Sequence, residues 1–341
     1  LSNSREDAAT MTIRALRPEE YDEHAELVYV SYTHERPAPE GSMLADRSWW
    51  LRGIERDPRY VPEQTRVMEL DGKLVASATC YERPTHMGAR QAKAACIGSV
   101  CTHPDYRRRG LVRQVLEEAV QWMAAEGFEW SFLYGKAEVY GGSGWLNLST
   151  WDTIANLRLR EDAPGDLTLR PADPEADLPV LMRIYNAFSG RMVGPTVRTE
   201  DYWRARILAA GPWSPAPVYE IAEQAGEPVG YVCMSGASVR EIGWLGRPHE
   251  LLAAIIARAE GQPVHFGFSL AKLTGALREV SAIPTQQQCF SEPGGVELRE
   301  AYRGLWRYHS PEPQSPTITD TSSLLRALRD LDYIMWPADR A

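Results

Sequence analysis

The sequence predicts a layered α/β (α+β) protein with two similar halves, each a mixed, mostly antiparallel sheet flanked by helices. The chain has 341 residues, of which 44% are hydrophobic, which suits two or three domains at about 150 residues each. Short apolar runs and longer stretches of helical periodicity alternate along the chain. The element order then begins again in the second half, where Leu169-Arg170-Pro171 echoes Leu16-Arg17-Pro18.

The first half, 11–157, follows a polar segment, 1–10, that we expect to be a flexible leader. Asp71-Gly72 is typical of a tight hairpin turn, and Gly127 is typical of a helix end. The expected elements are strand Thr12–Leu16, helices Ala25–Tyr32 and Ser48–Glu55, strands Arg66–Leu70, Lys73–Tyr81 and Ala94–Thr102, helix Leu111–Glu126, and strand Phe128–Tyr134.

A stretch rich in Pro, Gly and Asp, 158–174, is expected to be a linker to the second half, 175–341. We expect the segment near the end of the chain to form a short tail. The expected elements are helices Val180–Phe188 and Asp201–Leu208, strands Val218–Ala222, Val229–Met234 and Glu241–Leu245, helix Pro248–Ala259, strands Val264–Ser269 and Gly304–Tyr308, helix Thr321–Leu331, and strand Tyr333–Trp336.

Charge and cysteine content narrow the classes of protein. The formal net charge of -9 disfavours a nucleic-acid or membrane partner, because long-range forces would be repulsive. No apolar run approaches the roughly 20 residues of a membrane-spanning helix, so we expect a soluble, cytoplasmic protein. The five cysteines lack C-x-x-C spacing and the histidines lack ligand spacing, which predicts reduced core thiols and no metal site.

One motif carries recognisable chemistry. The predicted strand that ends at Thr102 is followed by Arg107-Arg108-Arg109-Gly110 and then by a strongly amphipathic helix. Free N–H groups and the dipole at a helix start bind phosphate, and a glycine there allows close approach. Arginine triplets are also common on solvated loops, but the placement between a strand and a helix favours a phosphate site.

This motif resembles the acyl-CoA signature Q/R-x-x-G-x-G/A of the GNAT superfamily of N-acetyltransferases, with Val112 in place of the last Gly or Ala. The element order resembles that of the same superfamily, which implies two tandem GNAT folds. The segment Val139–Trp145 is similar to the Eis-type aminoglycoside and lysine acetyltransferases. Such proteins usually close with a sterol-carrier-like domain of about a hundred residues, and we expect that domain to be shortened or missing here.

The resemblance implies acetyl-CoA, or another short acyl-CoA, as cofactor. Its pantetheine arm would pair with the strand end, the backbone amides of the loop and helix start would hold the pyrophosphate, and the corner after the next strand would flank the cofactor. The residues carried over are Val100, Cys101 and Thr102 for the arm, Arg108, Arg109, Gly110, Leu111, Val112 and Arg113 for the pyrophosphate, and Gly135 and Lys136 for the corner.

The resemblance also implies two catalytic groups. Tyr140 matches the tyrosine proposed as general acid toward the leaving thiolate. A phenol, whose ordinary pKa is about 10, can donate a proton to the sulfur. In the Eis-type family the terminal carboxylate of the chain is assigned as general base, which here is Ala341. Glu82, at the end of a predicted strand, is the alternative base, although an exposed hairpin carboxylate is the simpler interpretation.

The resulting hypothesis is an acetyl-CoA-dependent N-acetyltransferase. It would act by direct transfer on a primary amine of a small cationic molecule, such as an aminoglycoside-like or other natural-product amine, or on a lysine side chain. A non-catalytic acyl-CoA-binding module and an aminoacyl-tRNA-dependent transferase are the alternatives, and homo-oligomerisation stays open. The second half reads Trp244–Glu250 at the equivalent loop, without the arginine cluster, so we expect it to be structural.

Overall fold

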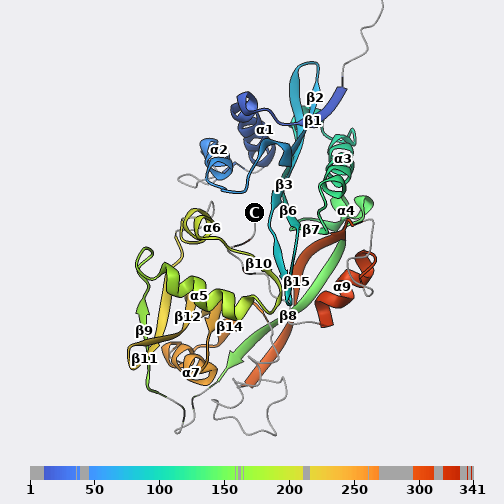
Figure 1. Ribbon diagram of the computed structural model, residues 1–341. Coiled ribbons are helices and arrows are strands. Elements are labelled where there is room, and N and C mark those ends of the chain that lie inside the picture. The colour runs from blue at the N-terminus through green and yellow to red at the C-terminus, as the bar shows by residue number, and fades with distance from the viewer. Residues whose placement is uncertain are drawn as a thin grey trace, which may run out of the picture.

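The computed structural model describes residues 11–35, 37–38, 46–157, 159, 163, 165–209, 216–259, 261–268, 295–310, 318–330, 336 and 339. Its strands form a 12-stranded sheet that runs through the whole molecule, in the order β1-β2-β3-β6-β7-β15-β8-β14-β13-β12-β11-β9, and a second, 3-stranded sheet, β10-β4-β5 (Figure 1). Most neighbouring strands are antiparallel, and the β6–β7 and β13–β14 pairs are parallel. The expected mixed α/β fold is confirmed.

The N-terminal unit occupies one end of the large sheet. Asp71 and Gly72 both have positive φ, as the expected tight turn between β2 and β3 requires. The described elements are β1 (Met11–Ala15), α1 (Tyr21–Thr33), α2 (Ser48–Glu55), β2 (Thr65–Leu70), β3 (Lys73–Glu82), β4 (Thr85–Met87), β5 (Arg90–Ala92), β6 (Ala94–Thr102), α3 (Leu111–Ala125), β7 (Trp130–Leu133), α4 (Ala137–Tyr140) and β8 (Leu146–Asn156).

Helices cover the two faces of this end of the sheet. Helix α1 packs Leu27 and Val28 against a cluster on one face, and α3 packs Val115 and Leu116 against the other. In Figure 1, α1 and α3 lie on opposite sides of the strands. The helical spacing of the apolar residues in α3 therefore reports its buried face.

The second unit repeats this pattern at the other end of the sheet. Its largest cluster of buried residues joins α5 and α7 to the strands and includes Tyr185, Trp203 and Tyr231. The described elements are β9 (Leu167–Pro171), α5 (Leu178–Ser189), β10 (Val193–Thr196), α6 (Glu200–Tyr202) followed by a π-helical turn Trp203–Ile207, β11 (Tyr219–Gln224), β12 (Glu227–Ser235), β13 (Ser238–Trp244), α7 (Pro248–Arg258) and β14 (Val264–Phe266).

The two units share strands. Strand β15 (Gly295–Tyr308) lies between β7 and β8, so a segment from the C-terminal part of the chain completes the N-terminal unit. Strand β8 in turn pairs with β14 of the second unit. Helix α9 (Thr321–Asp330) then packs its apolar side on the β8–β15 region. The sequence predicted a strand Gly304–Tyr308 within a short tail, and the structure shows a longer strand of 14 residues that lies inside the large sheet.

Two further differences concern segments without a clear apolar pattern. The expected linker 158–174 contains β9, which pairs with β11 at the sheet edge. Strand β8 was not expected, because only part of it is buried and it follows a Gly-rich turn. Of the strand expected at Tyr333–Trp336, residues 333–335 lie outside the described residues.

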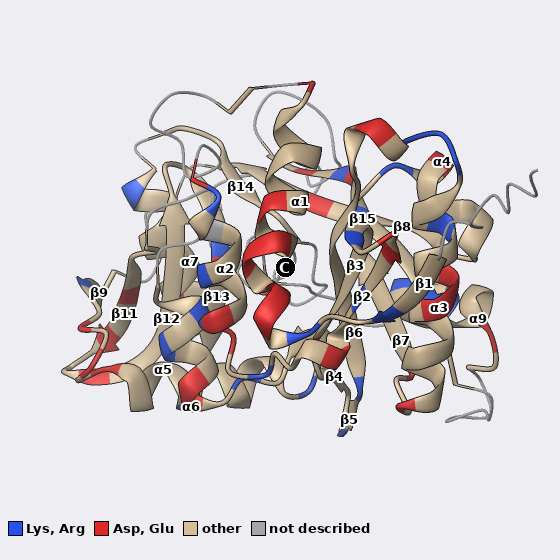
Figure 2. Cartoon of the chain, turned by 90° about the horizontal axis from the view of Figure 1, so that it is seen from above, with Lys and Arg blue, Asp and Glu red and all other residues tan. Residues whose placement is uncertain are grey.

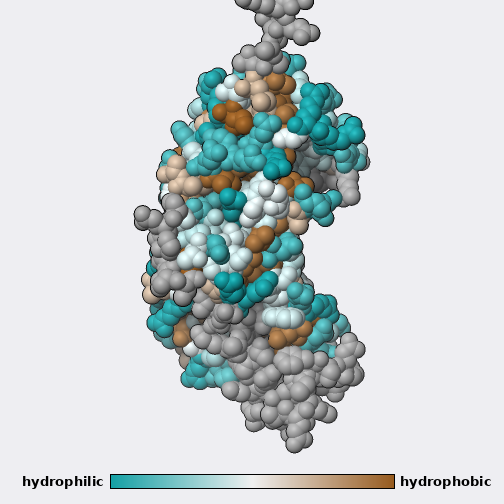
Figure 3. All heavy atoms as spheres, turned by 90° about the vertical axis from the view of Figure 1, so that its right-hand side faces the viewer, coloured by the Kyte–Doolittle hydropathy of each residue, from teal (hydrophilic) through white to brown (hydrophobic). Residues whose placement is uncertain are grey.

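Buried thiols and surface character agree with the composition. Cys80, Cys96, Cys101 and Cys233 are buried thiols that form no disulfide with one another, as expected, and Cys289 lies outside the described residues. None of the helices in the described ranges has the length and apolar content needed to cross a membrane. On the face shown in Figure 3, hydrophobic residues form separate small patches between hydrophilic ones.

Candidate active site

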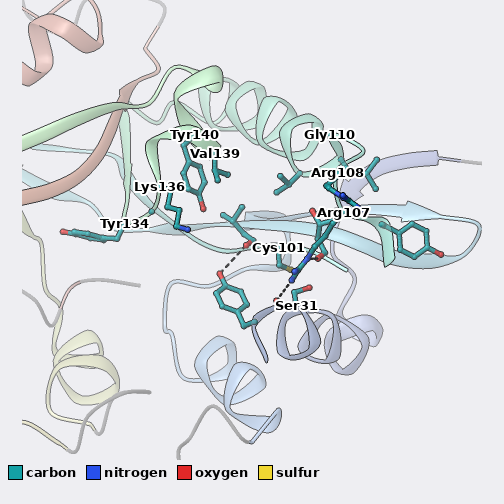
Figure 4. Close-up of a pocket in the computed structure, with 16 residues that line it drawn as sticks. Ser31, Cys101, Arg107, Arg108, Gly110, Tyr134, Lys136, Val139 and Tyr140 are labelled. Atoms are coloured by element: carbon teal, nitrogen blue, oxygen red, sulfur yellow. Dashed lines mark hydrogen bonds between the residues drawn. The ribbon is translucent and has the colours of Figure 1, made fainter. Parts of the chain in front are cut away.

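The parallel strands β6 and β7 separate soon after they start to pair. Three residue pairs join them, from Ala94 with Trp130 to Cys96 with Phe132. Beyond Cys96, β6 continues along β3 as far as Thr102, whereas β7 remains paired with β15. Among the described strands, none pairs with the other edge of this part of β6, next to the start of α3 (Figure 4).

A bulge in β6 shapes this edge. The register with β3 shifts between the pairs Thr79–Gly98 and Ser77–Cys101, and Ser99 has a positive φ of 49°. This backbone conformation is unfavourable for serine. Two hydrogen bonds stabilise it, because Ser77 Oγ donates to the Ser99 carbonyl at 2.9 Å and the Tyr81 hydroxyl pairs with Ser99 Oγ at 3.1 Å.

Backbone groups at the end of β6 point into the gap. His103 N–H donates to the Val75 carbonyl of β3 at 2.8 Å, so the alternating groups of Thr102 face away from β3. The Val100 carbonyl likewise faces the gap, where it accepts a hydrogen bond from the Tyr32 hydroxyl at 3.3 Å. An extended ligand could therefore pair with this edge as an additional short strand.

The turn after β6 presents the start of α3 to the same gap. Gly110 caps the helix with a φ of 73°, and Arg108 also has a positive φ of 63°. A Cβ added to Gly110 would have no heavy atom within 4 Å, so the space beside it is open. The first-turn N–H groups of a helix have no partner within the helix, so they can bind an anion.

The basic residues of this turn have different environments. The Arg107 guanidinium donates to the Ser31 carbonyl at 2.7 Å and forms an ion pair with Glu35, which ties the turn to α1. Arg109 lies over the Tyr106 ring at 5.2 Å, and Arg113 pairs with Glu117 at 2.9 Å.

A pocket of about 580 Å³ lies between these elements. Ten of the predicted residues line it, which are Val100, Cys101, Thr102, Arg108, Gly110, Leu111, Val112, Gly135, Lys136 and Tyr140. Arg109 and Arg113, which were also predicted, do not line it. The other lining residues were not predicted as site residues: Ser31, Tyr32, Tyr106, Tyr134 and Val139, together with Arg107, which was expected only as part of the motif. Ser31 and Tyr32 lie on α1, far from the motif in the sequence, and no motif of their own indicated that they line the pocket.

Tyr140 lies across the pocket from β6. It ends the short helix α4, and its ring packs so closely on Gly135 that a Cβ at that glycine would collide with it. The ring also meets Trp145 edge to face, with centroids 6.5 Å apart. Burial raises the pKa of the Tyr140 phenol to about 12, so the hydroxyl is protonated at neutral pH. In Figure 4 the side chain points toward the gap above β6.

Of the two predicted bases, only Glu82 lies within the described residues, and it does not line this pocket. Ala341 lies outside the described residues. Asp339 is fully buried and forms hydrogen bonds with Arg198 at 2.9 and 3.0 Å. Glu82 ends β3, where it pairs with Ala95 of β6, and is not among the pocket-lining residues. Among the described residues, no group of three or more His, Cys, Asp or Glu side chains is arranged to hold a metal ion.

The second unit has a related strand arrangement. Strands β13 and β14 pair at only two positions, Ser238 with His265 and Val239 with Phe266. Arg247 caps α7 with a φ of 60°, and its side chain pairs with Glu250 at 3.0 Å. The loop therefore offers one arginine, and that arginine already has a carboxylate partner.

Comparison with known proteins gives the class of the N-terminal unit. Residues 12–147 match the family model described as Acetyltransferase (GNAT) domain. Domains of this family bind acetyl-CoA, and the chain is an enzyme of the acyltransferase class. No curated protein matches the sequence.

Solved structures share the fold of both units. The chain is similar to a protein of Enterococcus faecalis V583 described as "Probable N-Acyltransferase", with a TM-score of 0.65 and 16% identity over 88% of this chain and 73% of that chain. A GCN5-related N-acetyltransferase from Anabaena variabilis gives 0.61 and 15% over 88% and 73%. Eis1 from Mycobacterium abscessus gives 0.57 and 17% over 86% and 73%.

Proposed function

We propose that this enzyme transfers an acetyl group from acetyl-CoA directly to a primary amine within a ternary complex. The observation that carries the proposal is the divergence of β6 from β7 beside the start of α3, with Tyr140 on the opposite wall. This arrangement combines a strand edge for an extended amide-containing arm, a helix start for phosphate and a neutral phenol in one pocket.

The described residues fit acetyl-CoA by their chemistry. The backbone of Val100 and Thr102 would pair with the amides of the pantetheine arm, and Gly110 leaves room for pyrophosphate at the helix start. Arg108 and Lys136 line the pocket on its two sides and supply positive charge for the phosphates. Bound acetyl-CoA supplies a thioester as the acyl donor.

The transfer needs stabilisation of the carbonyl oxygen, a proton for the departing sulfur and an acceptor for the proton of the amine. The neutral amine attacks the thioester carbonyl, a C–N bond forms, and the C–S bond breaks. Backbone N–H groups in the Val100–Thr102 stretch would stabilise the negative charge that develops on the carbonyl oxygen. Tyr140 would donate a proton to the departing sulfur, and the proton lost from the amine passes to a base or to water.

We propose a small cationic amine as acceptor, such as an aminoglycoside-like or natural-product amine, or a lysine side chain. The net charge of -9 supports this, because an acidic protein attracts cations. Figure 2 shows acidic residues along α1, where Asp22 and Glu23 are exposed. We also propose an Eis-like tandem arrangement in which the second unit is structural, because its loop lacks the arginine cluster.

A thiol-release assay with acetyl-CoA and a panel of amines tests the proposal. We expect release that depends on both acetyl-CoA and a cationic amine, with acetylated amine as the product. If acetyl-CoA binds but no amine promotes release, the protein is an acyl-CoA-binding module instead.

A further inference from the structure

The segment that carries Tyr140 connects two strands that are not neighbours. Residues 134–145 run from the end of β7 to the start of β8, and β15 lies between these strands in the sheet. The connection therefore crosses the inserted strand. Two side chains of β15, far away in the sequence, contact it near its two ends.

The first contact is at the start of the segment. The Tyr302 hydroxyl of β15 donates a hydrogen bond to the Gly135 carbonyl at 3.0 Å, across 167 residues of sequence. Gly135 is also the residue on which the Tyr140 ring packs, too closely for any side chain. The position of this peptide therefore determines where the ring lies.

The second contact is at the end of the segment. The Arg307 guanidinium of β15 donates to the Ser143 carbonyl and lies over the Trp145 ring, 5.6 Å from its centroid. Gly144 has a positive φ of 87°, and a Cβ there would collide with Arg307. Trp145 is buried and packs edge to face against Tyr140, so this contact also reaches the Tyr140 ring.

We propose that Tyr302 and Arg307 are positioning residues that hold the Tyr140 hydroxyl in its reactive orientation. The inference rests on the proposed function, because it takes Tyr140 as the general acid. It extends that function by making catalysis in the N-terminal unit depend on a strand from the C-terminal part of the chain. Neither side chain lines the pocket, so both act through the backbone and ring contacts of the Tyr140 segment.

Tyr302 suits a test because the loss of its hydroxyl group should not disturb the fold. Its side chain is 45% exposed, and Tyr302→Phe removes only the hydroxyl and its hydrogen bond. One hydrogen bond corresponds to a roughly threefold to tenfold effect on a rate or equilibrium. We therefore expect Tyr302→Phe and Arg307→Gln each to lower kcat by about that factor, with the KM for acetyl-CoA changed less than about twofold.

A double-mutant cycle separates positioning from general destabilisation. Tyr302→Phe is measured in the wild-type enzyme and in a Tyr140→Phe background, with acetyl-CoA and the amine at saturation. If Tyr302 acts through the Tyr140 hydroxyl, the loss of kcat seen in the wild type should vanish in the second background. Arg307→Lys, which keeps the charge and a donor, should recover part of the loss caused by Arg307→Gln.

A matched control lies on the same strand. Arg299 is exposed and pairs with Glu297 at 3.3 Å, away from the Tyr140 segment, so Arg299→Gln should leave kcat unchanged. If Tyr302→Phe lowers kcat by the same factor in the Tyr140→Phe background as in the wild-type enzyme, the positioning role is overturned, while the proposed function stays intact. An unchanged kcat in Tyr140→Phe alone would overturn the general acid, and the positioning role with it.

Discussion

The rings of Phe132 and Trp306 stack with centroids 4.9 Å apart and an interplanar angle of 24°. Phe132 lies on β7, which the acetyltransferase domain match includes, and Trp306 lies on β15, well beyond that match. Both side chains are fully buried. The core of the N-terminal unit therefore contains a residue from the C-terminal part of the chain.

Trp306→Ala should destabilise the protein strongly. Removal of a buried tryptophan from a packed core costs about 3–5 kcal/mol, because the cavity does not collapse fully. Urea unfolding followed by circular dichroism measures the loss. Trp151→Ala on β8, where the side chain is 50% exposed, serves as control and should cost less than about 1 kcal/mol. Equal losses for both variants would show that β15 does not complete this core.

Tyr140→Phe should lower kcat by about a hundredfold or more, the range typical of general acid catalysis, and should leave acetyl-CoA binding nearly unchanged. Because burial raises the Tyr140 pKa to about 12, the phenol keeps its proton through neutral and moderately alkaline pH. The wild-type kcat should therefore not decline up to about pH 10, where an ordinary tyrosine would be half ionised. Steady-state kinetics across pH checks this. A kcat that falls with an apparent pKa near 8 would contradict the assignment of Tyr140.

Gly110→Asp should raise the KM for acetyl-CoA at least about tenfold, because a carboxylate at the helix start crowds and repels pyrophosphate. Gly127 provides a matched control at the other end of α3. It also has a positive φ, 76° against 73°, and a Cβ there likewise meets no atom within 4 Å. Gly127→Asp introduces the same charge and similar backbone strain away from the pocket, so the KM should not change. Similar KM values in the two variants would argue against phosphate binding at Gly110.

The buried His24 should make the protein less stable in mild acid. Its side chain is 1% exposed, its Nε2 lies 3.2 Å from Ser77 Oγ, and burial lowers its pKa to about 4. An unfolded histidine takes up a proton below about pH 6.5, whereas folded His24 does so only near pH 4. His24 alone should therefore lower the free energy of unfolding by about 3 kcal/mol as the pH decreases from 6.5 to 4.

Urea unfolding at several pH values measures this slope. His309 is also buried with a lowered pKa, to about 3, so His24→Gln should reduce the slope and not abolish it. The exposed His34 is the control, and His34→Gln should leave the slope as in the wild type. A slope unaffected by His24→Gln would mean that this histidine does not contribute to acid sensitivity.

Local patterns predicted the elements of the first half well. The bounds of α2 and β6 agree with the expectation, and α3 differs by one residue at its end. These segments have strong periodicity and clear end signals, such as Gly110 and Gly127. Strand β8 lacked such signals, since it buries only some of its residues. Strand β9 lay in a stretch whose Pro and Gly content indicated a linker.

The part of the candidate site that lies in or near one sequence motif was predicted. The turn Arg107–Gly110 and the residues on either side of it indicated a phosphate-binding helix start, and most of the residues named on that basis line one pocket. The pocket wall from α1, which brings Ser31 and Tyr32, could not be read in this way. Those residues reach the pocket through packing between elements, and no local pattern in the sequence encodes that packing.

The sequence by itself determined the mixed α/β class, the repeat of element order and the strand–turn–helix unit at Thr102–Leu111, because each depends on residues close together in the chain. Only the tertiary structure decided that β15 lies between β7 and β8 and contacts the Tyr140 segment through Tyr302 and Arg307. Strand pairing depends on which edge a distant segment reaches, and the apolar alternation that marks a strand is the same for every possible neighbour.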